Sequence, residues 1–291
     1  MLSPICLFTY NRLSETKQTL EALQLNFLAS ESELFIFSDA AKAGGNQQKV
    51  VDVRNYLKTI TGFKKVEIIE SSVNKGLANS IIQGVTKIIN EYGKVIVLED
   101  DLITTPNFLE FMNQSLDFYA ENNNIFSIAG YSMDLPFLKN YDKDFYYGYR
   151  ASSWGWATWK DRWEAIDWQM NDYSHFKWNF RAQINFMRGG SDLPYMLWKQ
   201  MHGKIDSWAV RWCYNQFKND LLTVYPVKSK VESIGFGAAA THTKKTKRFF
   251  VVPDQEHKVS FRFENEAEID EQLYREFKNK FSVITRLKDR F

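Results

Sequence analysis

The sequence predicts an α/β protein whose mostly parallel sheet is flanked by helices, and two patterns support this. Four short apolar runs rich in β-branched and aromatic residues, at 4–10, 33–39, 66–70 and 94–99, follow one another at intervals of about thirty residues. Apolar residues at helical spacing separate each run from the next. Since strand, helix and strand in succession form a right-handed crossover, we expect four consecutive parallel strands.

Three helices are expected between these strands, and a fourth after the last of them. The first three span 14–24, 47–60 and 76–92, and Ser14 is expected to cap the first. One face of the third carries the apolar residues Leu77, Ile81, Val85 and Ile88. Pro106 is expected at the first position of the fourth helix, where a missing N–H costs no hydrogen bond.

Tryptophan is distributed unevenly along the chain. All nine tryptophans lie between residues 154 and 212, and none lies in the first 150 residues. We therefore divide the chain into an α/β half at 1–130, an aromatic-rich half of the same domain at 131–250, and a C-terminal extension at 251–291. Most of the nine indoles are expected in the core, because buried aromatic rings contribute most to packing.

The C-terminal extension carries dense mixed charge and a regular apolar pattern. Five apolar residues recur at near-helical spacing: Leu273, Phe277, Phe281, Ile284 and Leu287. This spacing predicts an amphipathic helix. Docking on the body of the protein is its expected role, and pairing with another subunit or peripheral contact with the inner membrane face are the alternatives.

Composition and charge exclude several classes of protein. The 291 residues carry 37 Lys and Arg against 35 Asp and Glu, a net charge of +2 that argues against nucleic acid as a partner. No apolar run approaches the roughly 20 residues of a membrane-spanning helix, and the N-terminus has no secretory signal pattern. Two isolated cysteines, Cys6 and Cys213, are expected to be buried thiols. Together these features predict a cytoplasmic protein.

Polar residues follow each predicted strand, where an α/β sheet binds its ligands. Neither the Gly-x-Gly-x-x-Gly of a dinucleotide fold nor the Gly-x-x-x-x-Gly-Lys-Ser/Thr of a P-loop occurs. A nicotinamide-dependent oxidoreductase and a P-loop NTPase are therefore disfavoured. The strands are followed instead by four polar groups: Tyr10-Asn11-Arg12, Ser38-Asp39, Asn74-Lys75-Gly76 and Glu99-Asp100-Asp101.

The acidic triplet is the strongest chemical signal in the first half. Carboxylates at a strand end repel a phosphorylated ligand unless a divalent cation lies between them and a diphosphate. On an extended chain Glu99 and Asp101 share one face and Asp100 points the other way. We therefore expect Asp101 to bind the metal, Asp100 to reach a ribose hydroxyl, and Glu99 to support the metal ligand and border the sugar. The alternative is that the adjacent aspartates only cap the next turn.

A second candidate for sugar binding is Trp154-Gly155-Trp156. Flat indoles cover the apolar faces of sugar rings, and a glycine between them allows a close approach or an unusual backbone angle. We expect this segment to line the donor or acceptor sugar site with one of its two indoles, while the other packs inward. The sequence does not choose between Trp154 and Trp156.

The four polar groups, in this order and spacing, resemble the nucleotide-sugar half of glycosyltransferases with the Rossmann-like GT-A fold, over about residues 3–130. The acidic triplet is similar to that of the N-acetylglucosaminyltransferase I group. The segments 151–163 and 232–243 resemble bacterial transferases that assemble surface polysaccharides. The Asp-Asp-Gly-Ser signature of the commonest family is absent.

The resemblance implies roles for individual residues. Asp39 would contact uracil or ribose, and Tyr10, Asn11 and Arg12 would border the base pocket. Asn74, Lys75 and Gly76 would complete the nucleotide site. Asp101 would hold Mn²⁺ or Mg²⁺ on the diphosphate.

The second half is expected to supply a catalytic base and a further metal ligand. Asp206 stands between a loop and a predicted helix, where such enzymes place their base, although an aspartate there also caps helices. By resemblance, His242 would reach back to the metal or diphosphate. The basic run Lys244, Lys245, Lys247 and Arg248 follows it.

The sequence thus predicts a metal-dependent, inverting glycosyltransferase that moves GlcNAc or another hexose from a UDP-sugar to a glycan or lipid-linked saccharide. Two alternatives stay open: a carbohydrate-binding protein without catalysis, which would not need the acidic triplet, and a sugar-nucleotide pyrophosphorylase, which would need a glycine-rich loop near the first strand. The oligomeric state is left open.

Overall fold

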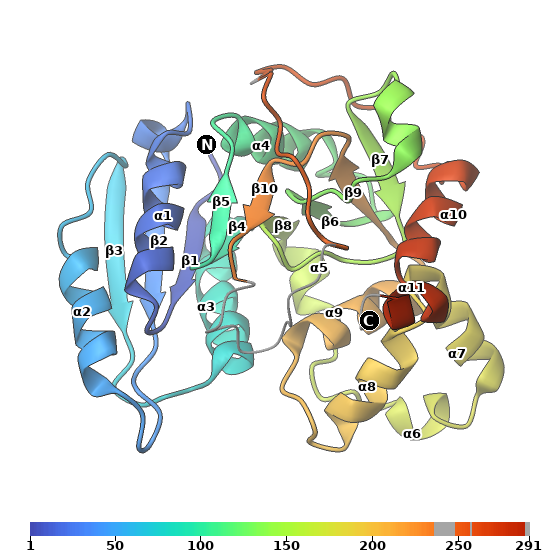
Figure 1. Ribbon diagram of the computed structural model, residues 1–291, viewed down its shortest axis with the longest axis horizontal. Coiled ribbons are helices and arrows are strands. Elements are labelled where there is room, and N and C mark those ends of the chain that lie inside the picture. The colour runs from blue at the N-terminus through green and yellow to red at the C-terminus, as the bar shows by residue number, and fades with distance from the viewer. Residues whose placement is uncertain (236–247, 257, 289–291) are drawn as a thin grey trace.

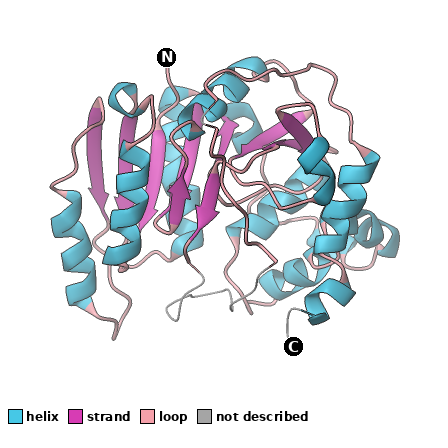
Figure 2. Ribbon diagram, turned by 45° about the horizontal axis from the view of Figure 1, so that its top comes forward, coloured by secondary structure: helices cyan, strands magenta, loops and turns pink. Residues whose placement is uncertain are grey.

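The computed structural model describes residues 1–235, 248–256 and 258–288, and its centre is a single eight-stranded sheet. The strand order is β3-β2-β1-β4-β8-β6-β9-β7, with helices on both faces (Figures 1 and 2). A second, two-stranded sheet pairs β5 (Leu102–Thr104) with β10 (Val231–Ser233) in antiparallel register. The division of the chain into two halves and an extension, with boundaries at residues 130 and 250, stays a prediction.

The four predicted strands of the first half are present and parallel. They are β1 (Ile5–Thr9), β2 (Glu33–Ser38), β3 (Lys65–Glu70) and β4 (Lys94–Glu99). β1 pairs with both β2 and β4, and β2 pairs with β3. Their carboxyl ends consequently meet at one edge of the sheet.

The second half extends the same sheet in mixed directions. β8 (Trp156–Trp159) lies antiparallel between β4 and β6 (Ile125–Ala129), β9 (Leu222–Pro226) runs parallel to β6, and β7 (Phe145–Gly148) runs antiparallel to β9. Only β7 and β8 oppose the other strands of the large sheet. The prediction of a mostly parallel sheet is therefore confirmed.

The helices of the first half are α1 (Leu13–Gln24), α2 (Gln47–Leu57), α3 (Leu77–Tyr92) and α4 (Phe108–Phe118). Two predicted helix starts are wrong. Ser14 lies inside α1, whose N-cap is Arg12, and Pro106 precedes Asn107, the N-cap of α4. A side chain that can cap a helix does so only where the chain turns into the helix, and the sequence does not locate that turn to the residue.

Short helices fill the connections of the second half. They are η2 (Pro136–Asn140), α5 (Lys160–Glu164), α6 (Tyr173–Phe176), α7 (Phe180–Phe186), η3 (Met187–Gly189), α8 (Leu193–Met201) and α9 (Trp208–Lys218). In the first half, η1 (Ala29–Glu31) lies between α1 and β2. Figure 1 shows α6, α7 and α8 gathered at one end of the molecule, away from β3 and α2. Within the described part of the chain, no helix is long and apolar enough to cross a membrane.

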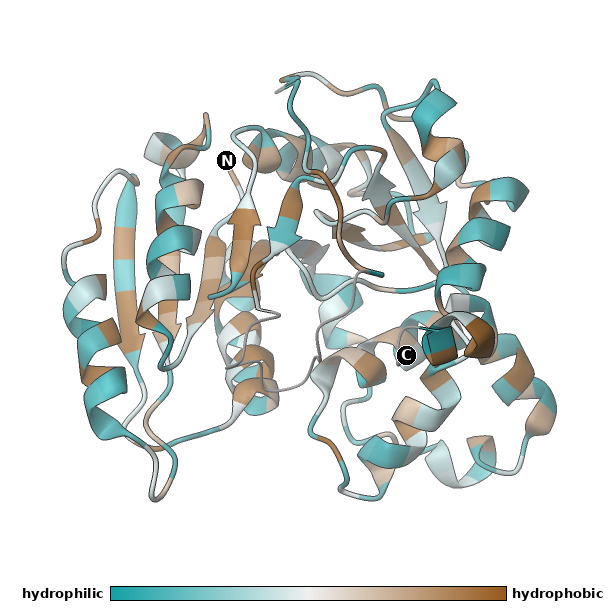
Figure 3. Cartoon of the chain, in the orientation of Figure 1, coloured by the Kyte–Doolittle hydropathy of each residue, from teal (hydrophilic) through white to brown (hydrophobic). Residues whose placement is uncertain are grey.

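Separate hydrophobic cores cover the two faces of the large sheet. The strands at the centre are hydrophobic, whereas the edge strand β3 alternates with polar residues (Figure 3). One core holds a cluster of indoles in which Trp156, at 0% exposure, packs on Trp163, Trp208 and Trp212. This confirms that the tryptophans mainly build core, and Cys6 and Cys213 are buried free thiols as predicted.

The C-terminal extension forms two helices where one was predicted. α10 (Glu271–Lys280) buries Leu273 and Phe277 in a third core, and Phe281 follows them. Ser282 then accepts a hydrogen bond from Thr285 N and starts α11 (Val283–Lys288), which leaves Ile284 exposed. Docking is therefore confirmed for the first part of the extension.

Candidate functional site

The polar groups of the first half converge at the carboxyl ends of β1 to β4. Asp39 N donates to Thr9 O at 3.1 Å, and Ser71 N donates to Ser38 O at 2.9 Å, so the parallel pairing continues past the strand ends. Tyr10 N donates to Asp100 Oδ2 at 3.2 Å. These bonds hold the segments after β1, β2 and β4 at one edge of the sheet.

Arg12 is the positive group of this edge. Its guanidinium donates through Nη2 to Asp100 Oδ1 at 2.5 Å, and its Nη1 lies 3.0 Å from Asp101 Oδ2. The expectation that Asp100 points away from Asp101 is wrong, because β4 ends at Glu99 and the chain turns there, which brings both carboxylates to one cation. Arg12 contacts the acidic pair in this structure, while its predicted place beside the base stays a prediction.

Burial raises the pKa of two carboxyl groups of the acidic triplet, Glu99 and Asp100. Burial, with smaller contributions from the Asp101 and Asp100 carboxylates, raises the pKa of Glu99 to about 8. Burial also raises the pKa of Asp100 to about 6, and Arg12 opposes this rise. Three adjacent carboxyl groups with one arginine form a site with an excess of negative charge, which a divalent cation would neutralise.

Asp39 is held by the segment between β3 and α3. Its carboxylate accepts hydrogen bonds from Ala40 N at 2.9 Å, Lys75 N at 2.9 Å, Gly76 N at 3.0 Å and Asn74 Nδ2 at 3.0 Å. Since a carboxylate offers about four acceptor positions, these four bonds use its capacity. The predicted contact of Asp39 with a nucleotide therefore requires one of these bonds to be given up.

Arg54 of α2 helps to position Asp39, and it is not among the site residues predicted from the sequence. Its guanidinium donates to Ser38 O at 3.2 Å and to Ser71 O at 2.7 Å, and it lies 3.2 Å from Glu70. It thereby ties the ends of β2 and β3 together. The sequence signal that could have identified Arg54 is its place among Val50, Val53 and Leu57, the buried residues of an amphipathic helix.

Asp206 faces the start of α3 from the second half of the chain. A Cβ atom at Gly76 would lie 3.7 Å from Asp206 Oδ2, and Gly76 has the positive φ of +74° that glycine tolerates. The alternative role of Asp206 as a helix cap is wrong, because Ser207 caps α9 by accepting from Val210 N. The Asp206 carboxylate is 62% exposed and lies 3.9 Å from Arg211 Nη2, so its side chain can meet a ligand.

The small sheet brings the end of β10 onto the metal candidate Asp101. Ile234 N donates to Asp101 O at 2.9 Å, and a Cβ at Gly235 would stand only 2.1 Å from Asp101 Oδ2. Only a residue without a side chain can stand there while Asp101 keeps its position. His242 lies outside the described residues, as do Lys244, Lys245 and Lys247; Arg248 is described and packs on Phe249.

The two indoles of the Trp154-Gly155-Trp156 segment have different surroundings. Trp156 is the indole that packs inward, and it cannot be the sugar contact, because its side chain is fully buried. Trp154 is half-buried, with its ring 4.6 Å from that of Tyr131 and 5.7 Å from that of Phe249. Gly155 has the unusual backbone angle foreseen for it, a φ of +58°, and a Cβ there would be 2.8 Å from Val231. Trp154 thus stays the candidate for the sugar.

The residues at the site suit a divalent cation that is shared with a substrate. Within the described ranges, no group of three or more His, Cys, Asp or Glu side chains is arranged to hold a metal. Mg²⁺ and Mn²⁺ are commonly bound by one or two carboxylates together with phosphate oxygens and water. Asp101 and Asp100, which already hold the cationic group of Arg12, match that donor set.

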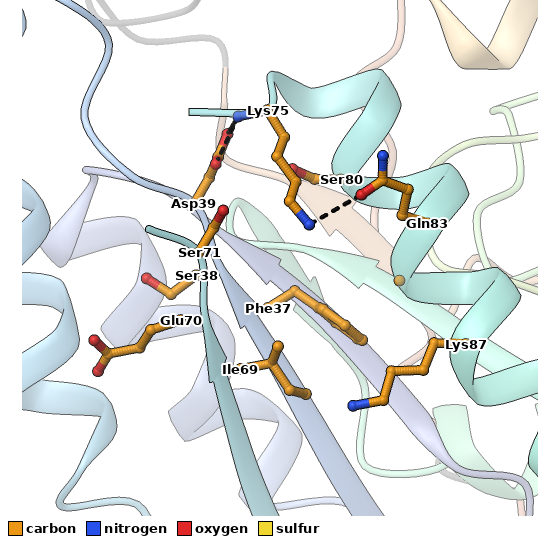
Figure 4. A pocket seen from close by; sticks show the side chains of 11 residues that line it. Phe37, Ser38, Asp39, Ile69, Glu70, Ser71, Lys75, Ser80, Gln83 and Lys87 are labelled. Atoms are coloured by element: carbon orange, nitrogen blue, oxygen red, sulfur yellow. Dashed lines mark hydrogen bonds between the residues drawn. The ribbon is translucent and has the colours of Figure 1, made fainter. Parts of the chain in front are cut away.

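A cavity of about 140 Å³ adjoins Asp39 (Figure 4). Phe37 and Ile69 from β2 and β3 form one wall, and Ser80, Gln83 and Lys87 of α3 form another. Lys75 Nζ donates to Gln83 Oε1 at its rim. Pockets for whole ligands typically have about 300–1,000 Å³, so this cavity is too small for a complete nucleotide sugar.

The sheet topology, the carboxylates at the strand ends and the second half that faces them define an α/β protein of the GT-A architecture. A model of the family described as "Glycosyl transferase family 2" matches residues 5–189, and the chain belongs to this family. Glycosyl transfer is the activity after which this family is named. No curated protein matches the sequence.

Some solved structures are similar to parts of this chain at low sequence identity. A structure of S. aureus TarS, residues 1–349, has a TM-score of 0.43 and 10% identity, covering 81% of this chain and 61% of that one. The same TarS fragment with UDP-GlcNAc has a TM-score of 0.32 and 12% identity, covering 44% and 34%. The mannosyltransferase PcManGT from Pyrobaculum calidifontis, with GDP-Man and Mn²⁺, has a TM-score of 0.38 and 9% identity, covering 55% and 46%. The chain thus spans less than two thirds of each of these relatives.

Proposed function

We propose that this protein is a glycosyltransferase that moves a hexose, GlcNAc being the first candidate, from a UDP-sugar to a hydroxyl group of a glycan or lipid-linked saccharide, with a divalent cation and with inversion. The observation that carries the proposal is the placement of Asp206. Its exposed carboxylate faces Gly76 at the edge of the sheet that also holds Asp100 and Asp101. A potential base from one half thus stands toward the candidate donor site of the other.

The donor side is assigned to the strand ends. Asp101 and Asp100 would hold the cation, which when bound neutralises charge on the diphosphate leaving group. Arg12 would then be released from the carboxylates and be free to contact phosphate oxygens. Tyr10, Asn11, Asp39 and the segment 74–76 would hold the nucleotide, and Glu99 would border the sugar.

Asp206 would remove the proton from the acceptor hydroxyl as that oxygen attacks the anomeric carbon. Inversion follows if the hydroxyl approaches from the face opposite the leaving diphosphate. Two other aspartates of the second half are engaged in ion pairs elsewhere. Asp192 makes a two-pronged ion pair with Arg150, and Asp161 pairs with Arg162.

A thermal-unfolding titration tests the donor and metal parts of the proposal. UDP, GDP, CMP and dTDP are each added with and without Mn²⁺, because a ligand that binds only the native state raises the unfolding temperature. We expect stabilisation by UDP that requires Mn²⁺. Stabilisation by GDP alone among the four would move the donor class to GDP-sugars, and equal stabilisation with and without Mn²⁺ would refute metal dependence.

A further inference from the structure

The helices α6, α7 and α8 carry exposed apolar side chains that neither the fold nor the proposed site uses. Trp178 is 73% exposed, Phe180 70%, Ile184 65% and Tyr195 56%. Monomeric proteins rarely expose so many large apolar residues on one small group of helices without an interaction partner. Trp178 lies in the turn between α6 and α7, and Phe180 begins α7. α7 packs beside α8, which bears Tyr195 (Figure 1).

Basic side chains accompany these apolar residues. Lys177, Arg181, Lys199 and Lys204 stand next to them, and none lies within 4.0 Å of a carboxylate among the residues that the structure describes. Lys199 Nζ is 4.7 Å from the centre of the Tyr195 ring, and Lys204 Nζ is 4.2 Å from that of Trp198. We call these four basic and four apolar side chains together the aromatic-basic surface.

The net charge of this region differs from that of the rest of the chain. Residues 173–204 contain five Lys and Arg but a single acidic residue, Asp192, whereas the whole chain has a net charge of +2. Asp192 is bound to Arg150 on the inner side and does not offset the exposed bases. The rest of the chain is thus net negative, and positive charge concentrates beside the exposed aromatic residues.

We propose that the aromatic-basic surface docks on a bilayer that contains anionic lipids. Trp and Tyr prefer the boundary between headgroups and acyl chains, and neighbouring Lys and Arg are attracted to anionic headgroups. Phe180 and Ile184 of α7 lie three and seven residues after Lys177. These two side chains would enter the acyl boundary while the basic groups stay at headgroup level. A nucleic acid or an acidic protein would match the positive charge of this surface but would offer less apolar surface for Ile184 to contact.

This surface is distinct from the C-terminal helix considered from the sequence, whose first part is docked on the body. It lies close to the acceptor side in the chain, because α8 ends at Met201 and the connection to α9 carries Lys204 and Asp206. Membrane docking through this surface would hold the segment between α8 and α9, which contains Asp206, near the lipid headgroups. The docking itself does not depend on the proposed function.

Vesicle co-sedimentation with the full chain tests the proposal. We expect binding to vesicles of phosphatidylcholine with phosphatidylglycerol, little binding to phosphatidylcholine alone, and weakening with salt. The variant Lys177→Glu/Arg181→Glu/Lys199→Glu should bind about tenfold more weakly or worse. The control Lys17→Glu/Lys49→Glu/Lys139→Glu changes the net charge equally on exposed residues elsewhere and should bind like the parent.

Insertion is tested separately from charge. Trp178→Ser/Phe180→Ser/Ile184→Ser should lose binding, whereas Leu25→Ser/Phe27→Ser/Val259→Ser, at exposed apolar positions elsewhere, should not. Brominated lipids should quench tryptophan fluorescence in the parent and less in Trp178→Phe. Circular dichroism checks that each variant is folded. The absence of binding to anionic vesicles, equal losses in both controls, or concentration-dependent self-association through these residues without vesicle binding would overturn the proposal.

Discussion

Gly235 lies so close to Asp101 that a Cβ atom at residue 235 would stand 2.1 Å from Asp101 Oδ2, the oxygen that also faces Arg12. The contact arises because β10 pairs with β5, the strand that directly follows the acidic triplet. The second half of the chain therefore holds the position of a carboxylate from the first half.

Gly235→Ala should accordingly displace the Asp101 carboxylate and weaken Mn²⁺-dependent binding of UDP. Isothermal titration calorimetry of the variant would measure the loss. Gly45→Ala, in an exposed loop where a Cβ meets nothing closer than 3.0 Å, is the control. Unchanged affinity in Gly235→Ala would show that Asp101 does not need its observed position.

Arg12→Gln should destabilise the metal-free protein. Removing the guanidinium leaves Asp100 buried without its cation, which costs about 1–3 kcal/mol in the free energy of unfolding. Mn²⁺ should restore more stability to the variant than it adds to the parent, because the cation then replaces the missing charge. Urea denaturation with and without Mn²⁺ measures both effects, and Arg181→Gln, at an exposed position, is the control. Equal gains in variant and parent would contradict this account.

The metal-free protein should lose stability as the pH rises from about 4.5 to 8. The pKa of Glu99 is raised by burial from its ordinary value near 4.5 to about 8, so the folded state binds more protons than the unfolded state in this interval. Folding is therefore most favoured below the unfolded pKa and loses this contribution as the pH passes the folded one. Glu99→Gln should flatten the curve of stability against pH in chelator-treated protein, and an unchanged slope would count against the raised pKa.

Arg54→Met should lower both stability and nucleotide affinity. The change keeps an apolar side chain of similar length but leaves the carbonyl group of Ser71 without its Arg54 donor, at a cost of about 1–3 kcal/mol. It also removes one of the two donors to the carbonyl group of Ser38, which keeps its bond from Ser71 N. Since Asp39 follows Ser38, the nucleotide site should loosen as well. Lys58→Met, at the C-cap of the same helix, should change neither property, because the Lys58 side chain is 63% exposed. Lower stability with full UDP affinity would restrict Arg54 to a structural role.

Asp206→Asn should leave donor binding intact and reduce the rate of transfer about 10²–10⁴-fold, the contribution expected of a general base. Donor affinity from calorimetry and turnover with a sugar acceptor separate the two effects. Asp142→Asn, another exposed aspartate, should behave like the parent. Near-full transfer by Asp206→Asn would remove the base from the mechanism.

Much of the first half could be predicted from its sequence, because its signals are local. The apolar runs gave four parallel strands to within one or two residues at each end, and the polar residues that follow them meet at one edge. The prediction that side chains alternate between two faces of the strand failed only past the end of β4. The chain turns there and brings Asp100 and Asp101 to Arg12.

The rest depends on contacts between distant segments, which local patterns do not encode. Whether Asp206 or its neighbour Ser207 caps α9 depends on the direction of the incoming chain. Trp154 and Trp156 are equivalent in sequence, but β8 turns Trp156 into the core. The pairing of β10 with β5, which places Gly235 against Asp101, joins residues about 130 positions apart and has no local signature.

The most direct test of the central claim is calorimetric titration of UDP in the presence of Mn²⁺, compared between the parent protein and Asp101→Asn. We expect the parent to bind UDP only with Mn²⁺, and we expect Asp101→Asn, shown to be folded by circular dichroism, to lose this binding. Equal UDP affinity in the two proteins, or affinity in the parent that is indifferent to Mn²⁺, would contradict the assignment of a metal-dependent donor site to the end of β4.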